Sequence, residues 1–273
     1  MRFNLIAPAL TVALVPMVAA AQAQTKNDNW SGTIGLMTVA MPSYLGSNQY
    51  RVKALPLLQM EYRNRAYFGG STGGTGAGVG YYIVRNSAVT VSTEIAGSPD
   101  RLERHGDGLA GMGKRSSGTF AGSNVSYQVG SLTAGAGVQV GLGKDEGSTA
   151  SLALSTKHYY AQKWMLGLST GATFANRQNM EYEFGVSSEQ ATRRQALIQG
   201  GDSRLDWTDA GSYDPGNGLK QATASVSLGY LMRKNVTAMA FANGSRLGSQ
   251  ASDSPLARQR NSIVGGVGMA YGF

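Results

Sequence analysis

The chain has 273 residues, no cysteine, 38 glycines and only 7 prolines, and 15% of its residues are charged. The lack of cysteine excludes disulfide bonds and a lipid anchor attached to an amino-terminal cysteine. The many glycines argue against a mainly helical fold, because each one weakens a helix interior. The formal net charge is +8, so nucleic acid has to be considered as a partner.

Residues 1–23 have the pattern of a secretory signal peptide. Arg2 gives a basic start, an apolar stretch follows from residue 5 to about residue 21, and Ala21-Gln22-Ala23 is a small-x-small cleavage site. A buried or anchoring helix is the alternative, but two prolines and the cleavage motif argue against it. We therefore expect cleavage after Ala23 and a single exported domain over residues 24–273.

Alternation of side chains predicts about twelve β-strands after this segment. The run 132–142 has Leu, Ala and Val at even positions and Thr, Gly and Gln at odd positions, and successive side chains of a strand point to opposite faces. No stretch after Gln24 approaches the roughly 18 apolar residues of a membrane-spanning helix. The predicted strands are 31–41, 51–63, 65–71, 76–84, 87–96, 118–129, 132–142, 148–159, 163–175, 218–231, 234–247 and 260–273.

The two faces of these strands favour a membrane barrel. The less apolar face carries mostly Gly, Ser, Thr and Gln and few charges, which suits a barrel interior, while the apolar face would meet lipid. Closure also pairs every backbone group, as a membrane requires. We therefore predict an all-β fold: a closed antiparallel transmembrane β-barrel of about twelve strands, preceded by a cleaved signal peptide. A soluble β-sandwich is the alternative.

The connections between the predicted strands alternate in length. Those on one side have one to three residues, whereas those on the other side include 42–50, 97–117, 176–217 and 248–259. The turns 72–75 and 143–147 are short exceptions on the long side. This pattern is typical of outer-membrane barrels with both termini in the periplasm. The sequence leaves open whether 176–217 folds into the lumen, where its apolar segment 184–186 would form a short strand or plug.

The last twelve residues resemble the closing strand of a Gram-negative outer-membrane barrel. We expect the larger odd-numbered side chains to contact outer-membrane lipid, with lipopolysaccharide in the outer leaflet, and the small even-numbered ones to face the lumen. We interpret Tyr271 and Phe273 as the signal that the barrel-assembly machinery reads. The residues expected to face lipid are Ile263, Val267, Met269, Tyr271 and Phe273, and those expected to face the lumen are Gly266, Gly268, Ala270 and Gly272.

Charged residues gather on one face of the second predicted strand. Arg51, Lys53, Glu61 and Arg63 share this face, and we predict that they line the lumen, where they either select ions or pair with one another. Elsewhere basic residues are scattered singly without interleaved aromatic residues, and segment 176–217 has a net charge of −3. This distribution argues against a nucleic-acid partner.

The search for an enzymatic site finds little. Only His105 and His158 could serve as a general base, and neither lies in a motif typical of outer-membrane phospholipases or proteases. His105 and Asp107 could meet within one polar loop, but such pairs are usually solvated. The glycine run 69–78 lacks the Gly-Lys-Ser/Thr ending of a phosphate-binding loop. We expect no catalytic residues, no metal site and no cofactor, and hence no enzyme.

Several motifs along the chain resemble the MipA/OmpV family of outer-membrane proteins. The resemblance implies a non-enzymatic scaffold that joins a lytic transglycosylase, which cleaves murein (peptidoglycan), to a murein synthase. It supplies no catalytic residues. The alternatives are a narrow outer-membrane pore or osmotic-response channel, and a surface adhesin that uses 176–217. The motifs are Trp30-Ser31-Gly32-Thr33-Ile34-Gly35, Pro42-Ser43-Tyr44-Leu45-Gly46-Ser47, Phe184-Gly185-Val186-Ser187, Gly244-Ser245-Arg246-Leu247-Gly248 and Gly268 to Phe273.

Overall fold

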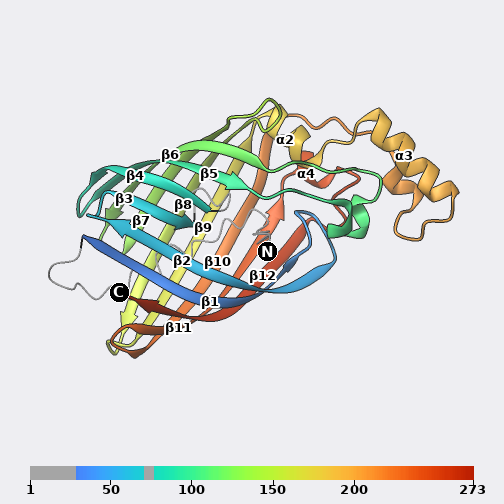
Figure 1. Ribbon diagram of the computed structural model, residues 1–273. Coiled ribbons are helices and arrows are strands. Elements are labelled where there is room, and N and C mark those ends of the chain that lie inside the picture. The colour runs from blue at the N-terminus through green and yellow to red at the C-terminus, as the bar shows by residue number, and fades with distance from the viewer. Residues whose placement is uncertain (1–28, 71–76) are drawn as a thin grey trace.

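The computed structural model describes residues 29–70 and 77–273, and its strands form one closed antiparallel barrel (Figure 1). All twelve predicted strands are present, and their ends differ from the prediction by at most two residues. The proposed signal peptide, 1–23, lies outside the described residues. The strands are β1 (Trp30–Pro42), β2 (Tyr50–Tyr62), β3 (Ala66–Gly70), β4 (Ala77–Arg85), β5 (Val89–Ser98), β6 (Gly118–Val129), β7 (Leu132–Gly141), β8 (Ser148–Tyr160), β9 (Trp164–Ala175), β10 (Gly218–Arg233), β11 (Val236–Leu247) and β12 (Asn261–Gly272).

Pairing between the first and last strands closes the barrel. β1 pairs with β2 on one side and with β12 on the other, so that Leu36 lies opposite both Pro56 and Met269. Every other strand pairs with its neighbours in the sequence. Short connections join strands at one end, which we call the turn end, and long connections join them at the other, which we call the loop end. The predicted alternation of connection lengths is therefore confirmed.

The two faces of the wall differ as the alternation predicts. Large apolar side chains on the outward face are well exposed, with Val52 at 68% and Val267 at 60%. On the inward face of β1 and β12, Thr33 is fully buried and Ala270 is 3% exposed. Aromatic rings gather near the turn end, where Trp30 stacks on Tyr62 with ring centroids 4.8 Å apart. An outward apolar band flanked by aromatic residues is the surface that a bilayer requires.

The inside of the barrel is not uniformly polar. One apolar cluster lies on the inward faces of β1, β11 and β12, with Leu55 and Leu57 of β2 packed against it. The small uncharged residues that the sequence predicts for the lumen line the inward faces of β8, β9 and β10 instead. The lumen therefore has one apolar side and one hydroxyl-rich side. The cluster contains Met37, Val39, Met41, Met239, Phe241, Val264 and Ala270.

The long connections at the loop end fold into short helices. Segment 176–217, whose conformation the sequence left open, contains α2 (Arg177–Phe184), α3 (Ser188–Gln199) and the 3-10 helix η4 (Trp207–Ala210). Asn176 caps α2 by accepting from the Asn179 amide, and Ser187 and Gln190 form a capping box on α3. The other helices are η2 (Glu103–His105), η3 (Asp107–Leu109) and α4 (Ser249–Ser252). Within the described residues, no helix is long and apolar enough to cross a bilayer.

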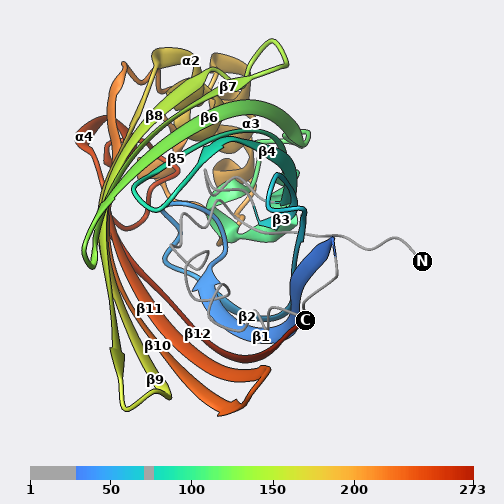
Figure 2. The same ribbon diagram turned by 90° about the vertical axis from the view of Figure 1, so that its left-hand side faces the viewer.

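These connections pack together as a unit that we call the loop cap, residues 99–117, 176–217 and 248–260. Met112, Val186, Ala191 and Leu256 form its small core, so each of the three segments contributes to it. A second cluster, which includes Met180 and Phe184 of α2, fastens the cap to the ends of β9 and β11. Of the apolar segment 184–186, Phe184 ends a helix, and Val186 forms an isolated β-bridge with Tyr213. Viewed from the turn end, the green segment around η2 and η3 and the golden α3 fall within the outline of the ring of strands (Figure 2), and the side view shows α3 beyond the strands at the loop end (Figure 1).

Candidate functional site

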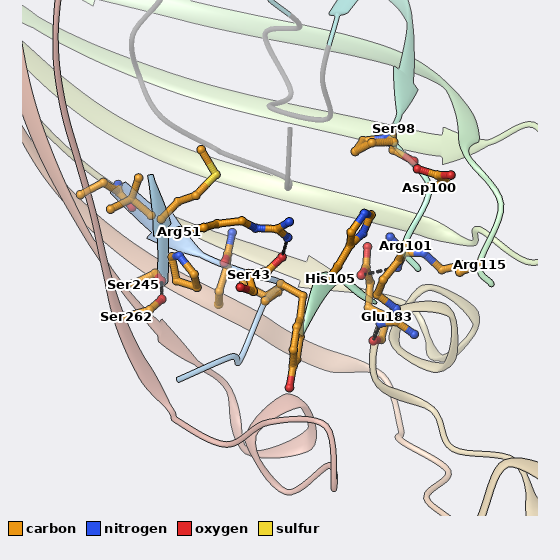
Figure 3. Close-up of a pocket in the computed structure, with 18 of the residues that line it drawn as sticks. Ser43, Arg51, Ser98, Asp100, Arg101, His105, Arg115, Glu183, Ser245 and Ser262 are labelled. Atoms are coloured by element: carbon orange, nitrogen blue, oxygen red, sulfur yellow. Dashed lines mark hydrogen bonds and ion pairs between the residues drawn. The ribbon is translucent and has the colours of Figure 1, made fainter. Parts of the chain in front are cut away.

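A cavity lies where the barrel lumen meets the loop cap. Its wall comes from inward-facing residues of β10, β11 and β12, namely Gln221, Thr223, Asn243, Ser245, Ser262 and Val264. Its roof comes from the first loop and the cap, through Ser43, Tyr44, Asp100, Arg101, His105, Arg115 and Glu183. Figure 3 shows Arg51, His105, Arg101 and Arg115 following one another along the cavity, with the serine pair of the wall drawn at the left, toward the Arg51 end of this row.

Arg51 is the second residue of β2 and points into this cavity. Its Nη2 donates to the carbonyl oxygen of Ser43, while its Nε is buried and has no hydrogen-bond partner among the described residues. Lys53 lies two residues further on the same inward face. Of the four lumen charges that the sequence predicts on this strand, Arg51 and Lys53 are the two that the structure brings together.

Glu61 shares the inward face of β2 but lies near the turn end. Ten residues separate it from Arg51, which at strand spacing is about 33 Å. Its Oε2 pairs with Arg85 Nη1 at 2.8 Å, and its Oε1 accepts from the Tyr82 hydroxyl at 3.3 Å. Glu61 is therefore neutralised locally and takes no part in the cavity.

Arg63 differs from the prediction because β2 ends at Tyr62. Arg63 lies in the turn with a φ of +50°, and Asn64 follows with a φ of +54°. The Arg63 Nε donates to Asn29 Oδ1 at 2.9 Å, and its guanidinium lies 5.2 Å from the centroid of the Tyr62 ring. The two left-handed residues make a tight turn, so the alternation of faces stops before Arg63 and this cation lies at the turn-end surface.

Three charged residues of the cap meet at the roof of the cavity. Arg115 Nη1 lies 2.5 Å from Glu183 Oε2, and Arg101 Nη1 donates to the Glu183 carbonyl oxygen at 2.6 Å. Lys220 Nζ lies 3.8 Å from the other oxygen of the same carboxylate. Burial alone would raise the pKa of Glu183, but Arg115, Lys220 and Arg101 outweigh it and hold that pKa at about 2. Glu183 is thus ionised and balanced by cations on both sides.

Burial lowers the pKa of both Arg101 and His105, but only Arg101 stays charged at neutral pH. Burial, reinforced by the nearby Arg115, lowers the pKa of Arg101 to about 10, which leaves it charged at neutral pH. Burial and the charge of Arg51 lower the pKa of His105, so its imidazole is uncharged at neutral pH. His105 Nδ1 accepts from the Leu102 amide at 3.1 Å, which places the proton on Nε2.

The arrangement does not have the features of a catalytic site. Asp107, which the sequence offered as a partner for His105, bonds to Gln49 instead, through its own amide at 2.9 Å and its carboxylate at 2.5 Å. His158 lies on β8 with its Nε2 3.0 Å from Thr156 Oγ1. Across residues 29–70 and 77–273, no three His, Cys, Asp or Glu side chains come together as metal ligands would. What the cavity offers is an excess of positive charge: three arginines against Asp100 and Glu183.

A comparison with models of protein families tests the family resemblance that the motifs suggest. The family model described as MltA-interacting protein MipA matches residues 34–273. The chain belongs to the MipA family. The resemblance drawn from the sequence motifs is therefore confirmed over most of the chain. No curated protein sequence matches it.

Solved structures similar to this MipA-family chain include several porins and channels. The NanC porin matches with a TM-score of 0.43 and 7% identity, over 87% of this chain and 98% of that one. An outer membrane channel from Pseudomonas putida F1 gives a TM-score of 0.44 and 7% identity, over 91% and 97%. The KdgM porin in complex with disordered oligogalacturonate gives 0.41 and 10%, over 88% and 99%. No residue role is carried over from these structures.

Proposed function

We propose that this protein resides in the outer membrane, exported by a cleaved signal peptide, and acts there as a non-enzymatic platform for murein-remodelling enzymes. The description of its family as MltA-interacting supports a lytic transglycosylase as one partner, and the scaffold resemblance adds a murein synthase. The outward apolar face and its aromatic residues support insertion in a bilayer. The turn end would face the periplasm, where murein lies.

The observation that carries this proposal is the loop cap. Arg194 of α3 is fully buried, and its Nη1 donates to the carbonyl oxygens of Gly108 and Ala110 at 2.9 and 3.0 Å. It thereby ties 176–217 to 99–117 over the loop end of the barrel. Barrels that serve as general pores hold a water-filled channel, whereas loops plug others. A capped loop end favours a barrel that works through its turn end.

The turn end offers a partner a basic surface. We define the basic rim as Arg63, Arg65, Lys163, Arg233 and Lys234, all of which are exposed. The turns 63–65, 86–88, 130–131, 161–163 and 234–235 are all described, and they contain no Asp or Glu. The loop-end connections, by contrast, hold eleven Lys or Arg and thirteen Asp or Glu. Because short turns leave little contact area, recognition of an acidic enzyme face would depend on charge.

The test is co-purification from mild-detergent extracts of the outer membrane. The wild-type barrel should recover a lytic transglycosylase, and the variant Arg63→Glu, Arg65→Glu, Lys163→Glu and Lys234→Glu should not. Reversal of two exposed cap residues, Lys114→Glu and Arg193→Glu, is the matched control and should leave recovery intact. Recovery of no murein enzyme with the wild type would contradict the proposal.

A narrow pore or osmotic-response channel is the second candidate, and the cavity at the loop end of the lumen favours it. This candidate predicts ion conductance in planar bilayers that changes when Arg51 or Lys53 is neutralised. A bilayer that stays silent with inserted, folded wild-type protein would exclude it. The adhesin hypothesis predicts that deletion of 176–217 abolishes surface binding.

A further inference from the structure

We infer that the cavity beneath the loop cap binds a small anionic solute that carries a carboxylate or phosphate group together with hydroxyl groups. This site is independent of the platform role, which concerns the turn end. The inference rests on the charges that the cavity leaves uncompensated and on the hydroxyl and amide groups that line the same cavity.

The acidic groups at the cavity do not neutralise its cations. Both oxygens of the Glu183 carboxylate are already engaged, one by Arg115 and one by Lys220. Neither Arg51 nor Arg101 forms an ion pair with a described residue, since Arg51 donates to the Ser43 carbonyl and Arg101 to that of Glu183. Asp100 is the only other acid in the lining.

Two arginine N–H donors at the cavity also lack a hydrogen-bond acceptor. The Nε atoms of Arg51 and Arg115 are buried and make no hydrogen bond with the described part of the chain. A buried charge without a counter-charge destabilises the folded state. An anion between the guanidinium groups would supply the counter-charge that Arg51 and Arg101 lack, and the acceptors that the Nε atoms of Arg51 and Arg115 lack.

The strand wall of the cavity supplies groups of another kind. Thr223, Asn243 and the hydrogen-bonded pair Ser245 and Ser262, whose Oγ atoms lie 2.8 Å apart, line it from three adjacent strands. Neutral His105 adds an Nε2–H donor on the cationic side. Hydroxyl and amide groups of this type both donate and accept, so they suit the hydroxyl groups of a polyol or sugar.

Titration calorimetry on the full mature protein in an uncharged detergent at low salt tests the inference. The probes are glucuronate, glucose 6-phosphate and, as the neutral control, glucose. We expect the acidic sugars to bind and glucose not to, and the tighter of the two identifies carboxylate or phosphate as the preferred group. Binding should weaken as salt is added, since it depends on charge.

Variants separate the cavity from general surface charge. Arg51→Gln should weaken anion binding about tenfold, equivalent to about 1.4 kcal/mol, and Arg101→Gln should do the same if Arg51→Gln fails to fold. Arg104→Gln, an exposed neighbour of His105 outside the lining, should bind as the wild type does. The inference is overturned if neither acidic sugar binds the wild type, or if Arg104→Gln weakens binding as much as the cavity variants. Loss of this site would leave transglycosylase recovery unchanged, so the two proposals fail separately.

Discussion

Arg194 of α3 and Asp209 of η4 are joined twice within the loop cap. The Arg194 Nε donates to the Asp209 carbonyl oxygen at 2.6 Å, and its Nη2 lies 3.5 Å from Asp209 Oδ1. Arg258 holds the second carboxylate oxygen, with Nη2 2.6 Å from Oδ2. One acidic side chain therefore connects α3 to the 248–260 segment. Because Arg194 also reaches two carbonyl groups of 99–117, it links all three parts of the cap.

Arg194→Met should therefore loosen the cap while leaving the barrel folded. The methionine keeps an apolar side chain but removes the guanidinium, which leaves three carbonyl groups and part of a carboxylate buried without their donor. Breaking a buried ion pair in this way costs about 3–5 kcal/mol. We expect rapid cleavage of 176–217 by proteinase K, with the barrel unchanged by heat modifiability on gels. Arg193→Met, at an exposed position that makes one bond to Gly111, is the control, and equal cleavage of both variants would refute the prediction.

The charge cluster around Glu183 predicts that acid opens the cap. Its pKa lies at about 2, below the ordinary value of 4.5. A depressed pKa means that the ionised carboxylate stabilises the fold above pH 4.5, and that this contribution is lost as pH falls from about 4.5 to about 2. The shift corresponds to about 3 kcal/mol.

Pulsed hydrogen exchange of the α2 and α3 amides measures this effect, after correction for the intrinsic pH dependence of exchange. Protection should hold at pH 5 and decline between pH 4.5 and pH 2 in the wild type. Glu183→Gln should lower protection at pH 5 and remove most of the decline. An identical decline in the variant would show that another carboxylate is responsible.

The strands could be predicted from the sequence because their information is local. Alternation with a period of two shows directly in runs such as 132–142, and it fixes which side chains share a face. The cavity could not be predicted in the same way. Arg115 and Glu183 are 68 residues apart and meet only because two connections fold over the same end of the barrel. No periodic pattern marks such a contact.

Arg63 shows where the local pattern stops being informative. It continues the odd-numbered series of Arg51, Lys53 and Glu61, so the sequence places it on the same face. The strand ends one residue earlier, however, and the left-handed backbone of Arg63 and Asn64 redirects its side chain to the turn-end surface. The inward apolar cluster escaped prediction for a related reason. Met37 and Val39 look like outward residues by hydropathy, but they lie on the inward face of β1, where they pair with Gly268 and Gly266 of β12.

The outward face of β12 predicts how the barrel meets lipid. Val267 lies midway along the strand, opposite Thr38 and Ala240, and is 60% exposed. Val267→Arg would place a cation near the centre of the bilayer and should lower the free energy of unfolding by about 2–4 kcal/mol. Ser227→Arg, on the inward hydroxyl-rich side of β10, should change it much less. Guanidinium titrations in phospholipid vesicles give both values, and a larger loss for Ser227→Arg would contradict the assigned faces.

The carboxyl-terminal residue closes the barrel seam at the turn end. Phe273 exchanges two backbone hydrogen bonds with Gly32, each 3.0 Å long. The ring covers this glycine so closely that a Cβ there would lie 2.8 Å from Phe273 Cζ. Tyr271, two residues earlier, lies opposite Ile34 and faces outward as well.

Deletion of Phe273 should therefore reduce the amount of folded barrel in the outer membrane. It removes two seam hydrogen bonds and the aromatic end that we expect the assembly machinery to read. Phe273→Tyr keeps both the backbone bonds and the ring, and should assemble normally. Phe273→Ala separates the two effects, since it keeps the seam bonds and loses the ring. Immunoblots of membrane fractions, with and without heating, measure the folded amount. Normal levels after deletion would exclude an assembly role for this residue, and normal levels for Phe273→Ala alone would assign the defect to the seam.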